Sequence, residues 1–230
     1  MTGRRLAALL GLCAGCSSLG ESGAVVAIEV RTPLPAVVEQ NDTLTLAARA
    51  LDQQGDSVGA TVLWESPDTT VVIVNGNQLT SDTSAGTGRV QARVGSLRSE
   101  LVTYTIRRRS DSLLLVGPAR DTVTSGAGET ESAALQARLE SYGSDTVGVA
   151  DAFIRFRIID ADTALASGAV AFPSGTLDTR IKTTSTGASI TLQVVNGVTP
   201  PDSLRLEVLA ERPSGAVVPG SGQRFTVVFE

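Results

Sequence analysis

The chain of 230 residues contains no histidine. This removes the commonest general base and the commonest metal ligand of proteins. It also excludes serine–histidine and cysteine–histidine nucleophiles. The only two cysteines are Cys13 and Cys16, so the remainder of the chain cannot hold a structural disulfide or a zinc site built from cysteines. The commonest catalytic and metal-binding chemistries are therefore missing.

Aromatic residues are also scarce, at 3% of the chain, although 42% of the residues are hydrophobic and 23 are glycine. This composition is typical of an ordered, β-rich protein with modest cores. The length suffices for one large or two small domains.

Basic residues are outnumbered by acidic ones, so the net charge is -5 and the isoelectric point is near 4.9. Such a chain does not attract the phosphate backbone, and no nucleic-acid partner is expected. The one basic run, Arg107–Arg109, is too short to bind phosphates and is interpreted as a solvated joint between domains.

Two stretches dominate the pattern: LTLAARALDQQGDSVGATVLW from Leu44 to Trp64 and LQARLESYGSDTVGVADAFIRF from Leu135 to Phe156. Each has an alternating segment, a polar turn with glycine, and a second apolar segment. Alternation of apolar and polar residues predicts half-buried strands, and two copies predict two domains of one kind. We expect Trp64 to lie in the first core and Phe156 to take its role in the second.

Alternation continues through the rest of the chain, which predicts an all-β sandwich or barrel in each half. Pro33 and Pro35 break the first strand because proline cannot donate to a ladder. Residues 161–176 show no clean period. The residues expected to face the cores are Val26, Ile28, Val30, Leu44, Leu46, Ala48, Ala50, Val62, Val90, Ala92, Val94, Val102, Tyr104, Ile106, Leu135, Ala137, Leu139, Ile154, Phe156, Ile158, Leu204, Leu206, Val208, Phe225, Val227 and Phe229.

Several motifs resemble a known family. NDTLTLAARALDQQG, Trp64-Glu65, the Asn75-Gly76 turn and AGTGRVQAR together resemble a group 2 bacterial immunoglobulin-like domain over residues 24–107. By that resemblance, Gly86 and Gly88 would serve a backbone bend. TTSTGASITL, from residue 183 to 192, resembles the end of invasin-type immunoglobulin-like repeats and places a second domain at 110–230. The expected fold is thus all-β, with two immunoglobulin-like β-sandwich domains in tandem after an N-terminal lipoprotein signal peptide.

The N-terminus has the order of a secretory signal: Arg4 and Arg5, an apolar run from residue 6 to 12, and small residues before a cysteine. That run is too short to span a bilayer as a helix. LCAGC resembles the lipobox of bacterial lipoproteins, although Cys13 stands where leucine is usual. The resemblance implies a signal peptide at 1–15, a lipidated Cys16 and a leash at 16–23; a plain cleaved signal or an uncleaved apolar tail are the alternatives. By the resemblance to bacterial lipoproteins, Ser17 and not aspartate after the cysteine implies an outer rather than an inner membrane.

Few side chains suggest a ligand site. Trp64 could stack on a sugar but is interpreted as core, and Tyr142 is expected to be exposed in a turn. The pairs Asp160/Asp162 and Asp52/Asp56 lack the spaced ligands of a calcium loop and are interpreted as solvated turn residues. Paired carboxylates for glycoside hydrolysis need only spatial proximity and stay open. We expect no catalytic residue, no metal and no cofactor.

The function predicted from these observations is that of a non-enzymatic surface lipoprotein, exported and anchored at an outer membrane or cell surface through Cys16. It would act as a structural spacer or as a protein or cell-surface interaction module of the adhesin kind. Its expected partners are the membrane, through the lipid anchor, and a protein or glycan at the cell surface. The alternative is a surface polysaccharide-binding protein that uses exposed loops, and a hydrolase is a third hypothesis.

Overall fold

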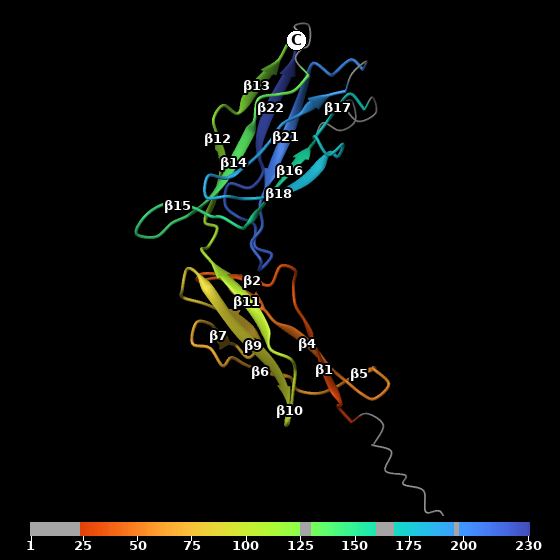
Figure 1. Cartoon of the computed structure of the whole chain (residues 1–230), viewed down its shortest axis with the longest axis vertical. Helices are drawn as coiled ribbons and strands as arrows, with labels where there is room; N and C mark the ends of the chain where they lie inside the picture. The colour runs from red at the N-terminus through yellow and green to blue at the C-terminus, as the bar shows by residue number, and fades with distance from the viewer. Residues whose placement is uncertain (1–23, 125–129, 160–167, 196–197) are drawn as a thin grey trace, which may run out of the picture.

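A computed structural model of the chain describes residues 24–124, 130–159, 168–195 and 198–230. The predicted signal peptide, Cys16 and the Asp160/Asp162 pair lie outside these residues. The described residues form strands and turns without any helix, so none of them belongs to a helix with the length and hydropathy of a membrane span. The strands build two sandwiches that follow one another along the long axis of the molecule (Figure 1).

The first sandwich contains three small sheets. Their strand orders are β1-β4-β5, β3-β8-β7 and β10-β9-β11-β2, and in the last of these β6 also pairs with β9. Most strands are short because proline, glycine and polar turns interrupt the apolar alternation. The strands are β1 (Ala27–Arg31), β2 (Val37–Glu39), β3 (Thr43–Thr45), β4 (Ala47–Leu51), β5 (Ser57–Val58), β6 (Leu63–Glu65), β7 (Val72–Val74), β8 (Gln78–Thr80), β9 (Gly86–Val94), β10 (Leu97–Arg98) and β11 (Val102–Arg107).

The stretch from Leu44 to Ala50 forms two strands, whereas the alternation predicts one. β3 pairs with β8, while β4 pairs with β1 and β5, so the chain passes from one sheet to another at Leu46. Leu44, Leu46 and Ala50 are nevertheless buried, as predicted. The alternation therefore survives a change of hydrogen-bonding partner.

The first core centres on Tyr104, Leu79 and Val90, each of which is fully buried. Trp64 is only half-buried and packs against the edge of this cluster. The reason is topological: β6 pairs with β9 alone, so its far side ends the sheet. The prediction that Trp64 anchors the core is corrected, because Tyr104 holds that position.

The second sandwich has a sheet ordered β12-β14-β15, with β19 also on β14, a five-stranded sheet ordered β13-β22-β21-β16-β18, and the short pair β17-β20. β17 falls within the stretch that shows no period in the sequence. The strands are β12 (Ser112–Val116), β13 (Arg120–Val123), β14 (Leu135–Ser141), β15 (Val147–Gly148), β16 (Phe153–Ile158), β17 (Val170–Ala171), β18 (Asp178–Lys182), β19 (Ala188–Ile190), β20 (Gln193–Val194), β21 (Ser203–Leu209) and β22 (Gln223–Phe229).

The second core is larger and follows the predicted alternation closely. Phe156 and Phe225 are fully buried at its centre, and the inward residues of β14, β16, β21 and β22 are all buried. β16 lies between β18 and β21, so Phe156 is covered on both sides. Phe156 occupies the position that corresponds to Trp64 in the first sandwich. Phe156 pairs with the inward residue Val208 of β21, and Trp64 pairs with the inward residue Ala92 of β9.

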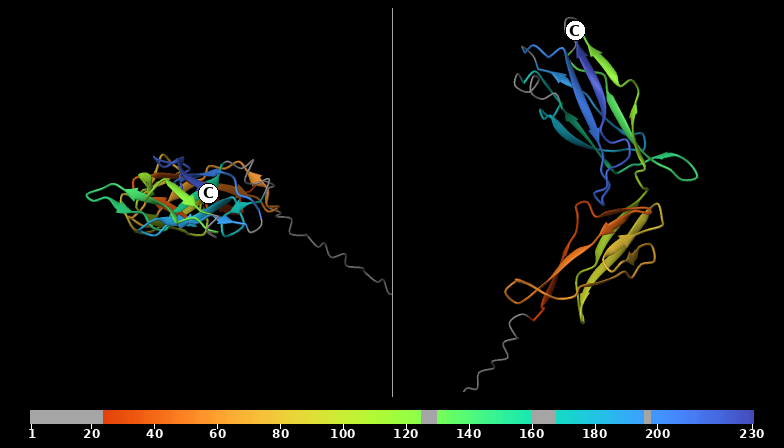
Figure 2. Two further views of the ribbon diagram at one scale, coloured as in Figure 1. Left: turned by 90° about the horizontal axis from the view of Figure 1, so that it is seen from above. Right: turned by 180° about the vertical axis from the view of Figure 1, so that it is seen from behind.

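Both sandwiches share an opening strand that changes sheets. β1 pairs antiparallel with β4, and after Pro33 and Pro35 the chain continues as β2, which runs parallel to the last strand, β11. In the second sandwich, β12 pairs antiparallel with β14, and after a break at Gly117-Pro118 β13 runs parallel to β22. This shared arrangement is that of immunoglobulin-like sandwiches. Figure 2 shows the two units from behind.

Gly86 and Gly88 lie in β9 and serve different purposes. Gly86 has a φ of +129°, which suits glycine, as the predicted bend requires. A Cβ on Gly88 would lie 2.4 Å from Cγ1 of Val71. Gly88 therefore allows a close approach of Val71 to the sheet.

Candidate functional site

Glu39 occupies the joint between the two sandwiches. It ends β2, and the parallel pairing of β2 with β11 places it opposite Arg107. The exposed fraction of its side chain is 0%, and that of the Arg107 side chain is 12%. A carboxylate is buried to this extent only when other groups compensate its charge.

Arg107 and Ser110 provide that compensation. Nε and Nη2 of Arg107 donate to Oε1 of Glu39 at 3.1 and 2.9 Å. The backbone N–H of Ser110 donates to Oε2 at 3.0 Å, and the Ser110 hydroxyl donates to Oε1 at 2.9 Å. Nη1 of Arg107 donates to the carbonyl oxygen of Asp151 in the second sandwich at 2.7 Å. Arg107 is therefore a mostly buried link, which corrects the interpretation of the arginine run as solvated.

The loop between β21 and β22 closes the joint from the second sandwich. Nε of Arg212 donates to the carbonyl oxygen of Ser110 at 2.9 Å and lies 3.7 Å from Oε2 of Glu39. The Ser214 hydroxyl donates to Oδ2 of Asp42 at 2.7 Å. Residues more than one hundred positions apart thus meet at the Glu39 carboxylate, and these contacts connect the two sandwiches.

A cleft of about 230 Å³ lies beside the joint, between the segment Pro33–Pro35 of the first sandwich and residues of the second that include Phe153, Arg180 and Arg212. Leu34 projects next to it with 94% of its surface exposed. The cleft is too small to bury a drug-sized ligand by itself, since such pockets usually measure about 300–1,000 Å³.

The outer surface of the five-stranded sheet carries an excess of cations. Because successive side chains of a strand alternate between faces, the buried residues of β16, β21 and β22 force their charged neighbours outward. We call this surface the basic face. Its cations are Arg120, Arg155, Arg157, Arg180, Lys182, Arg205 and Arg224, and its acids are Asp178 and Glu207.

Two arginines of the basic face lie directly opposite each other, Arg155 on β16 and Arg180 on β18. Like charges at such positions destabilise a sheet. The side chains turn apart: Nε of Arg155 donates to Oδ1 of Asp178 at 2.7 Å, while the Arg180 guanidinium lies 5.1 Å from the ring centroid of Phe153. Arg180 forms no ion pair with any described residue.

Each acid of the basic face interacts electrostatically with more than one cation. Hydrogen bonds from Arg155 hold the pKa of Asp178 below its ordinary value, and the charges of Arg155 and Arg157 act in the same direction. Glu207 pairs with Arg157 and lies 3.9 Å from Arg224. With Asp151 and Glu211 at the joint end included, the described residues set four acids against these seven cations.

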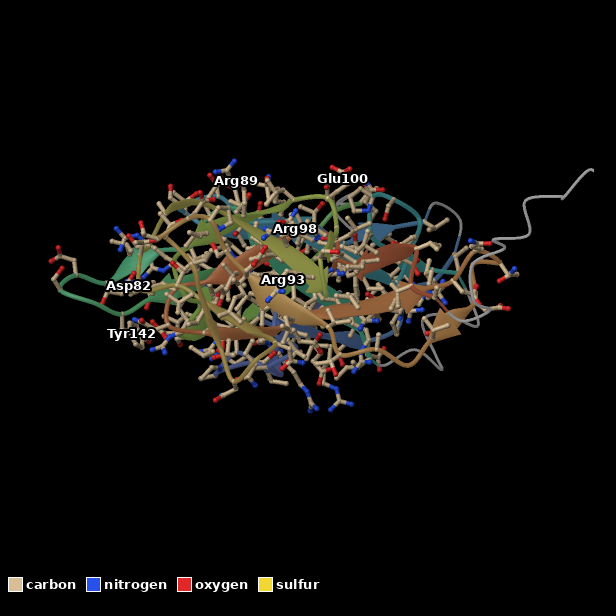
Figure 3. The ribbon with its side chains drawn as sticks, turned by 90° about the horizontal axis from the view of Figure 1, so that it is seen from below. Asp82, Arg89, Arg93, Arg98, Glu100 and Tyr142 are labelled. Atoms are coloured by element: carbon tan, nitrogen blue, oxygen red, sulfur yellow. The ribbon has the colours of Figure 1, made fainter. Side chains whose placement is uncertain are left out.

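The outer surface of the first sandwich also carries a group of arginines. Arg89, Arg93 and Arg98 gather on one side of it (Figure 3). Arg89 pairs with Asp68 at 2.8 Å, and both Arg93 and Arg98 pair with Glu65. Every one of these three arginines has an acidic partner.

The residues singled out in the sequence do not converge on one site. Tyr142 is 55% exposed, as predicted, and is the one exposed aromatic side chain among the described residues. Asp52 accepts hydrogen bonds from the backbone N–H groups of Gln54 and Asp56, at 3.0 and 2.9 Å, so it closes a turn. In the described ranges, no three or more cysteine, aspartate or glutamate residues are grouped as metal ligands.

Sequence reasoning missed the basic face and the buried joint. The outward positions of Arg155 and Arg157 are readable from the alternation of FIRFRI, and the same holds for Arg205 and Arg224 in their strands. Their assembly into one surface depends on which strands pair. Burial of Glu39 has no local signal, because its partners are 68 to 71 positions away or farther.

No family model matches the sequence, and no curated protein matches it. Solved structures with a similar course include the Yersinia pseudotuberculosis adhesin InvE, with 18% identity over 92% of this chain and 61% of that one and a TM-score of 0.40. Fibronectin(III)-like modules of Clostridium thermocellum CbhA share 9% identity over 88% of this chain and 94% of theirs, with a TM-score of 0.39. Domains 4–9 of the surface layer protein SbsC share 14% identity over 90% of this chain and 32% of theirs, with a TM-score of 0.33. These scores denote loose likeness, and the all-β fold described above rests on its own strand pairing.

Proposed function

We propose that the protein is a non-enzymatic surface lipoprotein whose two sandwiches form a stiff arm that holds an interaction surface away from a membrane. The observation that carries this proposal is the buried Glu39 joint. Two domains joined only by a flexible linker need no buried ion pair between them. The contacts that cross between the domains are those of Arg107 with the Asp151 carbonyl oxygen, of Arg212 with Ser110 and Glu39, and of Ser214 with Asp42, and they hold one domain against the other.

The membrane end of the arm is the proposed lipid anchor at Cys16, after a signal peptide at 1–15 and before a leash at 16–23. Each buried methylene contributes about 0.8 kcal/mol, so two or more acyl chains would hold the protein on an outer membrane stably. Within this proposal the first sandwich is a group 2 bacterial immunoglobulin-like domain and the second an invasin-type one.

The test of the anchor is membrane fractionation of the full chain in a bacterial host. Cys16→Ser should release the protein from the membrane fraction. Cys13→Ser is the matched control and should leave it there, because Cys13 is not the lipidated residue. Membrane retention of the Cys16→Ser protein would refute a lipid anchor at this residue.

A second candidate is polysaccharide binding through exposed loops. Sugar-binding loops typically present exposed aromatic rings, and Tyr142 alone is exposed among the described aromatic residues. The loops therefore offer little support, and the charged sheet surface is the better candidate for contact with a partner.

A further inference from the structure

We infer that the basic face binds an acidic polysaccharide through its carboxylates. This inference rests on the proposed function and deepens it, because it names acidic polysaccharides as the class of partner that the second sandwich binds. It concerns the outer surface of the five-stranded sheet, β13-β22-β21-β16-β18, and not the loops.

Positive charge is concentrated on the basic face of an otherwise acidic protein. The whole chain carries a net charge of -5, yet the strands of this one face hold seven cations and two acids. An acidic protein that gathers its cations on one flat surface creates a local field that attracts anions. Pairing with acids alone does not distinguish this face from the first sandwich, where Arg89, Arg93 and Arg98 also pair with acids. What distinguishes it is the number of cations per acid, since its paired cations are Arg155, Arg157, Lys182 and Arg224.

The sheet contains a repulsive pair of like charges. Arg155 and Arg180 are directly opposite each other, and Arg180 has no acidic partner among the described residues. Stacking on Phe153 fixes the Arg180 guanidinium in place, with its N–H donors unused by any carboxylate. A carboxylate between the two strands would accept hydrogen bonds from Arg180 and relieve the repulsion with Arg155.

The sheet sets the spacing of the backbone positions that carry these cations. Neighbouring strands are about 4.8 Å apart, and positions two residues apart on one strand are about 6.6–6.8 Å apart. A polyuronate carries one carboxylate per sugar ring, which suits such a grid. Double-stranded DNA carries one charge per about 1.7 Å of its axis, a much denser array.

The scarcity of exposed apolar side chains on the basic face favours a polysaccharide over a protein or a nucleic acid as its partner. Protein interfaces usually have an apolar or aromatic centre, and single-stranded nucleic acids stack on exposed rings. The exposed large hydrophobic residues of the described chain all lie outside the strands of this face, and the Phe153 ring is covered by Arg180. Charged and hydrogen-bonding contacts are therefore what this surface offers.

The test is binding of the full-length chain to immobilised polygalacturonate, with dextran as the neutral reference. We expect binding to polygalacturonate and not to dextran, weakened as salt is raised from 50 to 500 mM, on the order of a tenfold loss because exposed charges are screened. Arg180→Gln combined with Arg224→Gln should reduce the affinity about tenfold. Arg180→Lys should recover part of it, since lysine keeps the charge but not the two-pronged geometry.

The matched control is Arg89→Gln combined with Arg93→Gln on the first sandwich, which removes equal charge and should change the affinity less than about twofold. Both pairs of variants should keep the thermal unfolding midpoint within a few degrees, because all four side chains are exposed or partly exposed. If the basic-face pair unfolds, Arg180→Gln alone replaces it, since that arginine breaks no ion pair.

Three results would overturn the inference: no binding to polygalacturonate, an equal loss in the control pair, or tighter binding to polyglutamate or to double-stranded DNA. The last would assign the face to an acidic protein or to nucleic acid. None of these results bears on membrane fractionation of the Cys16→Ser protein, so failure of the glycan inference and failure of the anchored-arm proposal are distinguishable.

Discussion

Arg107 and Glu39 lie in register on two parallel strands, and two nitrogens of the guanidinium donate to one carboxylate oxygen at 3.1 and 2.9 Å. The third nitrogen of Arg107 reaches the backbone of the second sandwich. A single ion pair thus belongs both to the sheet of one domain and to the contact between two.

Glu39→Gln should destabilise the protein, because it leaves the buried charge of Arg107 without its counter-charge. The expected loss is about 3 kcal/mol, the lower end of the range for breaking a buried pair. Glu65→Gln is the control, since Glu65 pairs with the exposed Arg98 and such pairs are worth about 1 kcal/mol or less. Calorimetric melting of both variants measures the difference, and equal effects would argue against a stabilising joint.

Phe156→Ala should cost more than Trp64→Ala, although tryptophan is the larger side chain. Phe156 is fully buried between two strands, whereas Trp64 lies at a sheet edge. We expect about 3–5 kcal/mol for Phe156 and roughly half of that for Trp64. Urea unfolding followed by circular dichroism gives both values, and the reverse order would place Trp64 in the core after all.

Gly148→Ala should destabilise the second sandwich. A Cβ at this position would lie 1.8 Å from the carbonyl oxygen of Ser185, and a backbone atom cannot move aside cheaply. We expect a loss of about 1–3 kcal/mol or more, as for other overpacked sites. Gly59→Ala, where a Cβ meets no atom within 4 Å, should leave the melting temperature nearly unchanged.

Acid should weaken the first sandwich partly through Asp68. Hydrogen bonds from the Arg89 side chain, and then from its backbone N–H, hold the pKa of Asp68 below its ordinary value. The stabilisation is therefore complete above the unfolded-state pKa of about 3.9 and is lost as the pH falls through the lower folded-state pKa.

Asp68→Asn should consequently flatten the acid limb of a plot of melting temperature against pH. Asp82→Asn is the control, because Asp82 is exposed and its carboxylate forms no ion pair in the described part of the chain. A plot for Asp68→Asn that matches the wild type below pH 4 would show that this ion pair does not contribute.

Local pattern predicted much of the fold, because burial of alternate residues is a property of each strand by itself. Leu135, Ala137, Leu139 and Phe156 are buried as their alternation indicates. The pattern could not reveal the change of sheet at Leu46, since Leu44 before it and Ala50 after it are both buried, as in a single strand.

Features that depend on which strands pair across long stretches of sequence could not be predicted from the local pattern. The edge position of β6 leaves Trp64 only partly buried, and this position follows from the pairing of β6 with β9 alone. Likewise, Arg107 is largely withdrawn from solvent because Glu39, 68 positions earlier, lies beside it. The basic face combines strands that span residues 120 to 229, so no single stretch of sequence displays its charge.

The rigidity of the joint is the central claim and can be measured as a distance distribution. Spin labels at the exposed positions Asp82 and Asp145, one in each sandwich, with Cys13 and Cys16 replaced by serine, report the separation of the two domains by pulsed electron resonance. We predict one narrow peak for the native joint and a clearly broader distribution for Glu39→Gln. A distribution equally broad with Glu39 intact would contradict the stiff arm and leave two domains that move independently.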